Sequence, residues 1–244
     1  MKRMIIVGAT SGIGEGLARR YGERGGVRIG LIGRREELLK KISVSRPEVY
    51  EYAVCDVTDV AHVEDVLNDL ASRLGGVDML ILSAGTGELN PTLEYEKERR
   101  TLDLNVTGWT FVVGWAVRFF ERQGAGHLAA ITSVGGLRGD GVAPAYNATK
   151  SFQMNYLEGI RQRAAARHIP LVVTDVRPGF VDTAMAKGEG LFWVSSVDKA
   201  VGQIMRALDR RRKVVYVTRR WRWVAWLWKH IPDALFMRMG TSGE

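Results

Sequence analysis

The stretch Gly8-Ala9-Thr10-Ser11-Gly12-Ile13-Gly14 decides the fold of this chain. It follows an apolar run of strand character, Met4 to Val7, and leads into a helical pattern through Leu17, Ala18 and Tyr21. Glycines let a backbone approach a pyrophosphate closely, and a helix N-terminus offers free N–H groups. The order of strand, glycine loop and helix predicts a dinucleotide site. The spacing is Gly-x-x-x-Gly-x-Gly rather than the commoner Gly-x-Gly-x-x-Gly, and such a loop on its own is often only a tight turn.

Strand-like and helix-like segments alternate along the 244 residues. This alternation predicts one doubly wound α/β domain, a Rossmann fold, with a parallel sheet and helices on both faces. We expect strands at 3–8, 27–32, 49–54, 77–82, 127–132, 170–176 and 214–217. We expect helices at 12–24, 35–44, 59–73, 92–122, 145–167 and 197–209. The long helix should bend near Asn105 and Gly108, and 184–196 should form either a mobile lid or a plain surface connection.

Tyr146 and Lys150 are four residues apart on a predicted helix, so their side chains should leave from one face. A nearby ammonium favours the phenolate and lowers the pKa of the tyrosine. Tyr146 could then give and take a proton near neutral pH. The same spacing also occurs on ordinary solvated helix faces, so the pair gains meaning only from the rest of the chain.

Together, several motifs resemble the short-chain dehydrogenase/reductase family, single-domain type, from about Met1 to about Val217. In the family's order, they are Gly8 to Gly14, Asp56-Val57-Thr58, Ser83-Ala84-Gly85, Asn105, Ser133, Tyr146 with Lys150, and Pro178-Gly179-Phe180-Val181-Asp182-Thr183. One departure is clear: the third motif stands where the family usually has Asn-Asn-Ala-Gly, so the two asparagines are missing or replaced.

The resemblance implies a catalytic set of Asn105, Ser133, Tyr146 and Lys150. Tyr146 would be the acid/base, and Lys150 would lower its pKa and bond the nicotinamide ribose. Ser133 would polarise the substrate oxygen, and Asn105 would hold a water chain that reaches Lys150. The structural alternatives are a strand-end cap for Ser133 and a kink residue for Asn105.

The resemblance also implies a cofactor-binding set. Its members are Gly8, Thr10, Ser11, Gly12, Ile13, Gly14, Arg34, Asp56, Val57, Ala84, Gly85, Tyr146, Lys150, Pro178, Gly179, Val181 and Thr183. Asp56 would lie on the adenine side, with a helix N-cap as the alternative. Thr183 would reach the nicotinamide amide or the phosphates, with turn chemistry as the alternative.

The end of the second strand favours NADP over NAD. An acid there, about 20 residues past the glycine loop, would bind the ribose 2′-hydroxyl of NAD. Here that position is Gly33, and Arg34 follows, whose guanidinium suits a 2′-phosphate. The alternative is that Arg34 and Arg35 only pair with Glu36, Glu37 or a neighbouring helix. The family often has a second basic residue before the middle glycine, where this chain has Ser11.

The composition of the chain limits which kinds of site and which cellular compartments are compatible with it. The single cysteine, Cys55, excludes an intrachain disulfide, fits a reducing compartment and reads as a core residue. The four histidines have no metal-ligand spacing, so we expect no metal site. The start of the chain carries no signal-peptide pattern, and we expect a cytoplasmic protein. The net charge is +8, of which +7 lies from Arg206 onward, so the catalytic body is nearly neutral.

We expect a catalytic domain at 1–218 and an aromatic, basic, helical extension at 219–244. Four tryptophans fall within residues 221–228, among arginines. The segment is interrupted too early to span a membrane. Its composition suits a membrane surface through 219–239, a subunit contact, or packing on the body itself. No nucleic-acid motif accompanies the charge.

These observations predict an oxidoreductase that transfers a hydride between NADP(H) and a small carbonyl or alcohol. The family implies a homo-oligomer. Two alternatives are a non-catalytic dinucleotide sensor, which would not need the complete catalytic set, and a membrane-surface protein that works through its tail. An apolar substrate is favoured by the tail together with Phe192 and Trp193.

Overall fold

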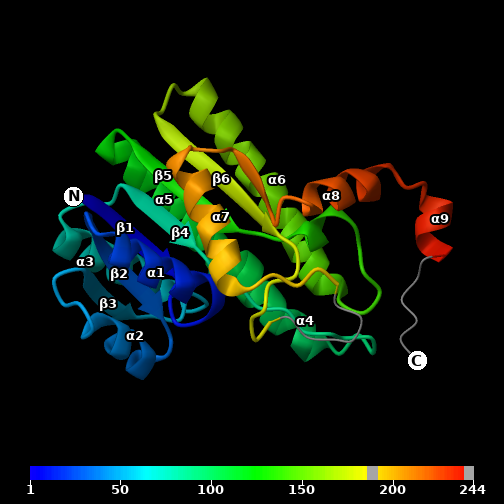
Figure 1. Ribbon diagram of the computed structural model, residues 1–244, viewed down its shortest axis with the longest axis horizontal. Helices are drawn as coiled ribbons and strands as arrows, with labels where there is room; N and C mark the ends of the chain where they lie inside the picture. Colours follow the sequence, from blue (N-terminus) through cyan, green and yellow to red (C-terminus); the bar gives the residue numbers. More distant parts are fainter. Residues whose placement is uncertain (186–191, 239–244) are drawn as a thin grey trace.

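The computed structural model of the chain describes residues 1–185 and 192–238, and within them one sheet organises the fold (Figure 1). All neighbouring strands run parallel, in the order β3-β2-β1-β4-β5-β6-β7. The strands are β1 (Lys2–Val7), β2 (Val27–Gly33), β3 (Tyr50–Val54), β4 (Met79–Leu82), β5 (Gly126–Ile131), β6 (Leu171–Pro178) and β7 (Val214–Val217). Each residue from Met4 to Val7 is buried, because a central parallel strand is covered on both faces.

Helices cover both faces of the sheet, and each face has its own apolar core. One face carries α1 (Gly12–Arg24), α2 (Glu36–Ser43) and α7 (Val197–Asp209). The other carries α3 (Val60–Leu74), α5 (Trp109–Gln123) and α6 (Pro144–Ala166). The expected doubly wound fold is therefore confirmed, and the expected strands begin and end within two residues of the observed ones.

The expected helix at 92–122 is three elements. These are α4 (Tyr95–Leu102), a π-helical stretch at Asp103–Gly108, and α5. The predicted bend near Asn105 and Gly108 falls in the π-helical stretch, where the wider turn changes the direction of side chains. Gly108 packs there against the carbonyl of Val57, where a methyl group would overlap it.

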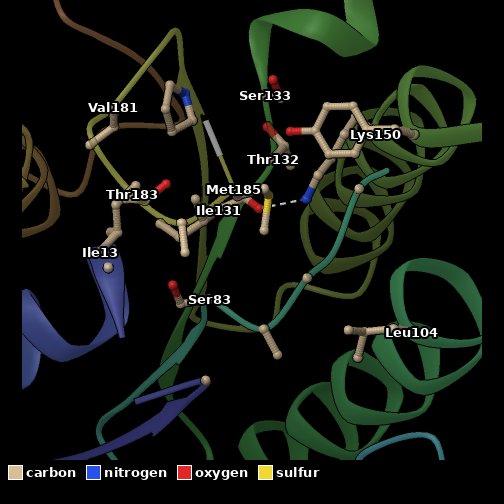
Figure 2. A pocket seen from close by; sticks show the side chains of 18 of the residues that line it. Ile13, Ser83, Leu104, Ile131, Thr132, Ser133, Lys150, Val181, Thr183 and Met185 are labelled. Atoms are coloured by element: carbon tan, nitrogen blue, oxygen red, sulfur yellow. Dashed lines mark hydrogen bonds between the residues drawn. The ribbon is translucent and has the colours of Figure 1, made fainter. Parts of the chain in front are cut away.

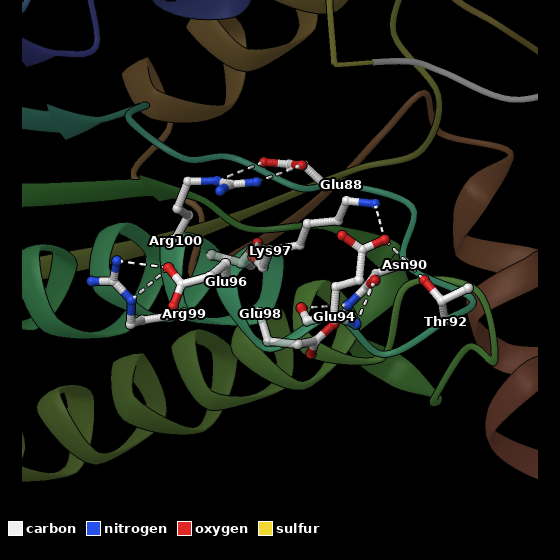
Figure 3. A network of polar contacts seen from close by, with 10 residues as sticks. Glu88, Asn90, Thr92, Glu94, Glu96, Lys97, Glu98, Arg99 and Arg100 are labelled. Carbon is white, nitrogen blue, oxygen red and sulfur yellow. Dashed lines mark hydrogen bonds and ion pairs between the residues drawn. The ribbon is translucent and has the colours of Figure 1, made fainter.

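Ion pairs bind α4 to the segment before it (Figure 3). Arg100 pairs with Glu88 at 3.2 Å, and Lys97 pairs with Glu94 at 2.7 Å. The buried Asn90 accepts from the backbone N–H of Glu94 at 2.9 Å and donates to its carbonyl at 3.1 Å. These contacts hold the segment around Glu88, which forms part of the rim of the site described below.

The chain reverses its direction of winding between β1 and β4. It moves outward from β1 to β2 and β3 and then returns to place β4 on the other side of β1. Such a switch point leaves a crevice outside the carboxyl ends of the strands, where ligands of these folds bind. The glycine loop follows β1, and Ser83 to Gly85 follow β4, so both lie at this crevice.

The extension forms α8 (Trp221–His230) and α9 (Asp233–Arg238), which lie beyond the carboxyl end of the sheet (Figure 1). α8 packs against β7 and against the short 3-10 helix Val134–Leu137. The division of the chain at residue 218 stays a prediction. Among the described residues, no helix has both the length and the apolar character needed to cross a bilayer.

Candidate active site

The glycine loop lies tightly between the ends of β1 and β4. Gly8 has φ +85°, and a Cβ there would lie 2.5 Å from the backbone nitrogen of Ala84. Gly12, with φ +56°, begins α1. Gly14 does not line the cavity, because it packs against the carbonyl of Gly8. The first turn of α1 therefore opens onto the crevice with its free N–H groups, an arrangement suited to a pyrophosphate.

Two arginines stand at the end of the crevice beyond β2. The Arg34 side chain is 68% exposed and lies 3.3 Å from a carboxylate oxygen of Asp56. Arg35 turns back over the glycine loop, where its Nη2 lies 2.6 Å from Thr10 Oγ1 and 2.8 Å from Ser11 Oγ. Arg35 was not in the predicted cofactor set. It places a cation beside Ser11, the position where the family's second basic residue was expected and not found.

Asp56 lies on the wall of the crevice below Arg34. Its carboxylate accepts from the backbone N–H of Thr58 at 3.0 Å and from the Thr58 hydroxyl at 2.8 Å. Burial alone would raise the pKa of Asp56, but the bonds from Thr58 and the charge of Arg34 outweigh burial and lower the pKa. The carboxylate therefore stays ionised. The residue at the N-cap of α3 is Asp59 rather than Asp56.

Ser133, Tyr146 and Lys150 all line the cavity. Figure 2 shows Ser133 and Lys150 on one side of it. Ser133 follows β5 and accepts from the N–H of Gly135 at 3.0 Å, so it also caps the 3-10 helix, as its structural alternative predicted. Tyr146 lies in the first turn of α6, and Lys150 lies one turn later. The Lys150 Nζ is 5.7 Å from the centre of the Tyr146 ring.

The pKa values of this pair differ from the expectation. Burial raises the pKa of Tyr146, and the hydrogen bond with Ser133 opposes that rise. Burial also lowers the pKa of Lys150 to about 8, and the negative charge of Asp175 counteracts this only partly. The prediction that Lys150 lowers the pKa of Tyr146 is therefore not met. Lys150 bonds the carbonyl of Ile131 at 3.2 Å, away from the phenol oxygen.

Asn105 does not line the cavity. It is fully buried, and its amide holds Thr86 by two bonds, from the Thr86 N–H at 2.9 Å and to the Thr86 carbonyl at 2.7 Å. The sequence analysis expected a water chain from Asn105 to Lys150. The Gln153 side chain joins the two directly, with Nε2 donating to the Asn105 carbonyl at 2.8 Å and Oε1 accepting from Lys150 Nζ at 3.1 Å. Its position three residues after Lys150 on a helix was the available signal.

A buried ion pair supports the strands beneath this wall. Asp175 is completely buried, and its carboxylate bonds Arg177 Nε at 2.7 Å and the Thr132 hydroxyl at 2.6 Å. Thr132 lies between Ile131, which holds Lys150, and Ser133. The bond between Thr132 and Asp175 joins residues 43 positions apart, so no local signal in the sequence pointed to it.

The opposite wall follows β6. Pro178, Gly179, Val181 and Thr183 line the cavity there, and Thr183 approaches the glycine loop, with its methyl 3.1 Å from where a Cβ on Gly12 would stand (Figure 2). The cavity measures about 580 Å³. All residues of the expected catalytic and cofactor sets line it except Gly14 and Asn105, which lie directly behind it.

Two tryptophans of the extension, Trp221 and Trp228, also line the cavity. Trp221 is buried and stacks edge-on against Phe180, with ring centres 5.5 Å apart, and it lies 5.2 Å from the ring of Phe192. Packing on the body, one of the three alternatives for the tail, therefore holds for this face of α8. The expected lid at 184–196 lies partly outside the described residues, since 186–191 are not among them.

Comparison with known proteins agrees with this architecture. The family model for short chain dehydrogenases matches residues 2–191. An uncharacterized oxidoreductase of Mycobacterium tuberculosis is 30% identical over 220 residues, 86% of this chain and 85% of that protein. An uncharacterized oxidoreductase of Staphylococcus epidermidis is 28% identical over 189 residues, 77% of this chain and 81% of that protein.

Two solved structures share the fold. A short-chain dehydrogenase from Streptomyces avermitilis superposes with a TM-score of 0.77 at 24% identity, covering 88% of this chain and 87% of that one. The protein ElxO, solved with NADP bound, gives a TM-score of 0.77 at 20% identity, covering 88% of this chain and 96% of that one. With the family model matched over most of its length, the chain belongs to the short-chain dehydrogenase family of NAD(P)-dependent oxidoreductases.

Proposed function

We propose that this enzyme transfers a hydride between NADP(H) and a carbonyl or alcohol substrate, with Tyr146 as the general acid/base. The observation that carries the proposal is the convergence of Ser133, Tyr146 and Lys150 on a cavity whose far end holds the glycine loop and two arginines. The Gly8 cradle, which a Cβ would fill, and the free N–H groups of α1 fit a dinucleotide.

In the reductive direction, NADPH held in this crevice would supply the hydride that the carbonyl carbon accepts. The Tyr146 hydroxyl gives its proton to the carbonyl oxygen, so one C–H bond and one O–H bond form as the C=O π bond breaks. Ser133 donates a hydrogen bond to the same oxygen and favours the charge that develops on it. The Lys150 ammonium, below its pKa of about 8, stabilises the phenolate that remains.

The preference for NADP rests on the charges beyond β2. Arg34 and Arg35 both line the cavity, and Gly33 offers no carboxylate for a 2′-hydroxyl. Arg34 is largely exposed, so its guanidinium can turn to a 2′-phosphate while keeping Asp56 as a neighbour. The solved structure of ElxO with NADP is consistent with this choice.

The substrate end of the cavity favours an apolar molecule. Its lining there is largely hydrocarbon and aromatic, with Leu104, Phe180, Met185, Trp221 and Trp228. Burying apolar substrate surface against such walls contributes about 25 cal/mol per Å². We therefore propose a hydrophobic aldehyde, ketone or alcohol.

Replacing Tyr146 by Phe tests the mechanism. The variant keeps the ring and loses the proton donor, so turnover with a reactive hydrophobic aldehyde and NADPH should fall by roughly two orders of magnitude or more. NADPH affinity should hardly change. Tyr95→Phe, an exposed tyrosine outside the cavity, serves as the matched control. Near-normal turnover of Tyr146→Phe would refute the role of Tyr146.

The wild-type protein separates this function from a non-catalytic sensor. A sensor would bind NADPH and turn over no member of a panel of hydrophobic carbonyls. We also propose a cytoplasmic homo-oligomer, on the family resemblance and the single buried Cys55. Light scattering would check the oligomeric state.

A further inference from the structure

Helix α8 has two apolar faces on opposite sides. Trp221, Ala225 and Trp228 recur at the spacing of one helix face, and they face the body and the cavity. Trp223, Trp226 and Leu227 lie about half a turn around, and they are exposed. A surface helix of a globular protein normally has one apolar stripe and a polar opposite face. The second stripe of α8 is therefore unexplained by the fold.

The inner face accounts for the docking of α8. Trp221 is 1% exposed and lies directly on Gly179, where a methyl group would overlap the indole. Ala225 is equally buried one turn later. The inner-face residues already form the contact between α8 and the body. The outer tryptophans are therefore not needed for that contact.

Exposed apolar residues occur on the outer face of α8 and on α9. The Trp223 side chain is 67% exposed and Trp226 is 60% exposed, and Leu235 and Met237 of α9 are also exposed. Figure 1 shows both helices beyond the carboxyl end of the sheet. Several exposed aromatic and aliphatic side chains on two neighbouring short helices mark a contact with a membrane or a protein partner.

Five basic residues lie on the same two helices or just before them. Arg219, Arg220, Arg222, Lys229 and Arg238 are exposed. Within the described part of the chain, none of these five forms an ion pair with a carboxylate. The acidic residue of the two helices, Asp233, is paired with Arg138 at 2.9 Å. The surface is therefore both apolar and strongly positive.

We infer that α8 and α9 bind the surface of an anionic lipid membrane. Indoles favour the boundary between headgroups and acyl chains, and arginine and lysine side chains meet anionic headgroups. A second copy of this chain would bring the same unpaired cations against this set, so charge repulsion opposes self-association here. The ten residues of α8 suit a helix lying in the interface plane.

The same helix then connects the membrane to the active site. Trp228 lines the cavity, and Trp226 and Leu227, its neighbours in sequence, point away from it. With α8 on the bilayer, the cavity mouth lies at the lipid surface. This deepens the substrate class proposed above: the hydrophobic carbonyl or alcohol is one that partitions into the bilayer.

Vesicle sedimentation tests membrane binding without any activity measurement, so its outcome is independent of the proposed reaction. The full chain should sediment with phosphatidylcholine vesicles that contain phosphatidylglycerol, and not with phosphatidylcholine alone. At about 1 M salt, where the Debye length falls to about 3 Å, it should be released. Arg222→Gln with Lys229→Gln should weaken partitioning about thirty-fold.

The control removes two exposed cations elsewhere, with Arg122→Gln and Arg210→Gln, and should leave partitioning unchanged. An equal loss of vesicle partitioning in both double variants would overturn the proposal. Partitioning would then depend on the net charge of the protein and not on the cations of α8. Trp223→Ser with Trp226→Ser provides an independent variant, which should also lose binding while its thermal unfolding stays near that of the wild type. If this variant instead lowers the oligomer mass, the surface is a subunit contact and the membrane proposal is wrong. Failure of the wild type to bind at low salt would overturn it as well.

Discussion

Lys150 donates a hydrogen bond from Nζ to Oε1 of Gln153, 3.1 Å away and three residues further along α6. Both side chains are buried, and the amide of Gln153 in turn holds the carbonyl of Asn105 at 2.8 Å. A buried ammonium needs acceptors, and Gln153 and the Ile131 carbonyl are the two it has among the described residues. We therefore propose that Gln153 is a positioning residue, which acts on the proposed catalytic site through Lys150.

Replacing Gln153 by Leu should move the basic limb of the pH profile for turnover to lower pH. The apolar side chain removes an acceptor that favours the charged form, so the pKa of Lys150 falls below its present value of about 8. A shift of about one pH unit corresponds to a lost charge-assisted bond. Gln153→Glu should move the limb the opposite way, since a carboxylate favours the ammonium. If maximal turnover falls in both variants but the pH of the basic limb stays the same, Gln153 has only a structural role.

Lys150 should weaken the folded state at neutral pH. Burial lowers its pKa from 10.5 to about 8, so between these values the unfolded chain binds the extra proton and stability rises with pH. Below about pH 8, Lys150 is charged in both the folded and the unfolded protein. The full cost of burying that charge then lowers the free energy of unfolding. Cofactor-free Lys150→Met should therefore exceed the wild type in stability at pH 7, by up to about 3 kcal/mol, while losing activity.

Urea unfolding at pH 7 and pH 10 checks this sign. The difference between Lys150→Met and wild type should shrink at the higher pH. Lys199→Met, an exposed lysine on α7, should show no such dependence. A difference that is the same at both pH values would show that the charge of Lys150 carries no such penalty.

Arg34 and Arg35 should distinguish the two nicotinamide cofactors. Each Ala variant should weaken NADPH binding roughly ten- to a hundredfold, because a charge-assisted bond contributes about 1.5–3 kcal/mol. NADH carries no 2′-phosphate, so its affinity should stay close to that of the wild type. Isothermal titration with both cofactors measures this, with Arg122→Ala as an exposed control. Equal loss for both cofactors would assign Arg35 to supporting Thr10 and Ser11 instead.

The sequence predicted the fold well because its signals are local. The apolar run before Gly8, the glycine loop and the alternating periodicities each specify one neighbouring element, and the parallel sheet follows from their order. Tyr146 and Lys150 were identified for the same reason, since a helix fixes their spacing. These features can be predicted without knowing which residues pack against them in the fold.

The functional residues that the sequence did not reveal make hydrogen bonds to partners on other helices or loops. Arg35 reaches Thr10 and Ser11 from the loop after another strand, and its neighbour Arg34 gave an equally good sequence signal. Gln153 bonds the Asn105 carbonyl from α6 to a π-helical stretch that periodicity did not predict. The pKa expectation for Tyr146 considered charge and left out burial, which depends on the assembled fold.

Two tryptophans on α8 provide the sharpest test of how the extension docks. Trp221 lies against Gly179, in the segment that lines the cavity, and Trp223 is exposed on the other side of the helix. Trp221→Ala should lower the free energy of unfolding by about 3–5 kcal/mol, because it leaves a cavity among Phe180 and Phe192. Trp223→Ala, the same change two residues away, should stay within about 0.5 kcal/mol.

Gly179→Ala tests the same contact from the body. A methyl group there overlaps the indole, so it should destabilise the wild type and should have a smaller effect in the Trp221→Ala background, where space has opened. Urea unfolding of the four proteins of this double-mutant cycle measures the coupling between the two positions. Additive effects, or equal losses for Trp221→Ala and Trp223→Ala, would mean that α8 does not rest on Gly179 at the cavity wall. The substrate wall proposed for Trp221 would then be wrong as well.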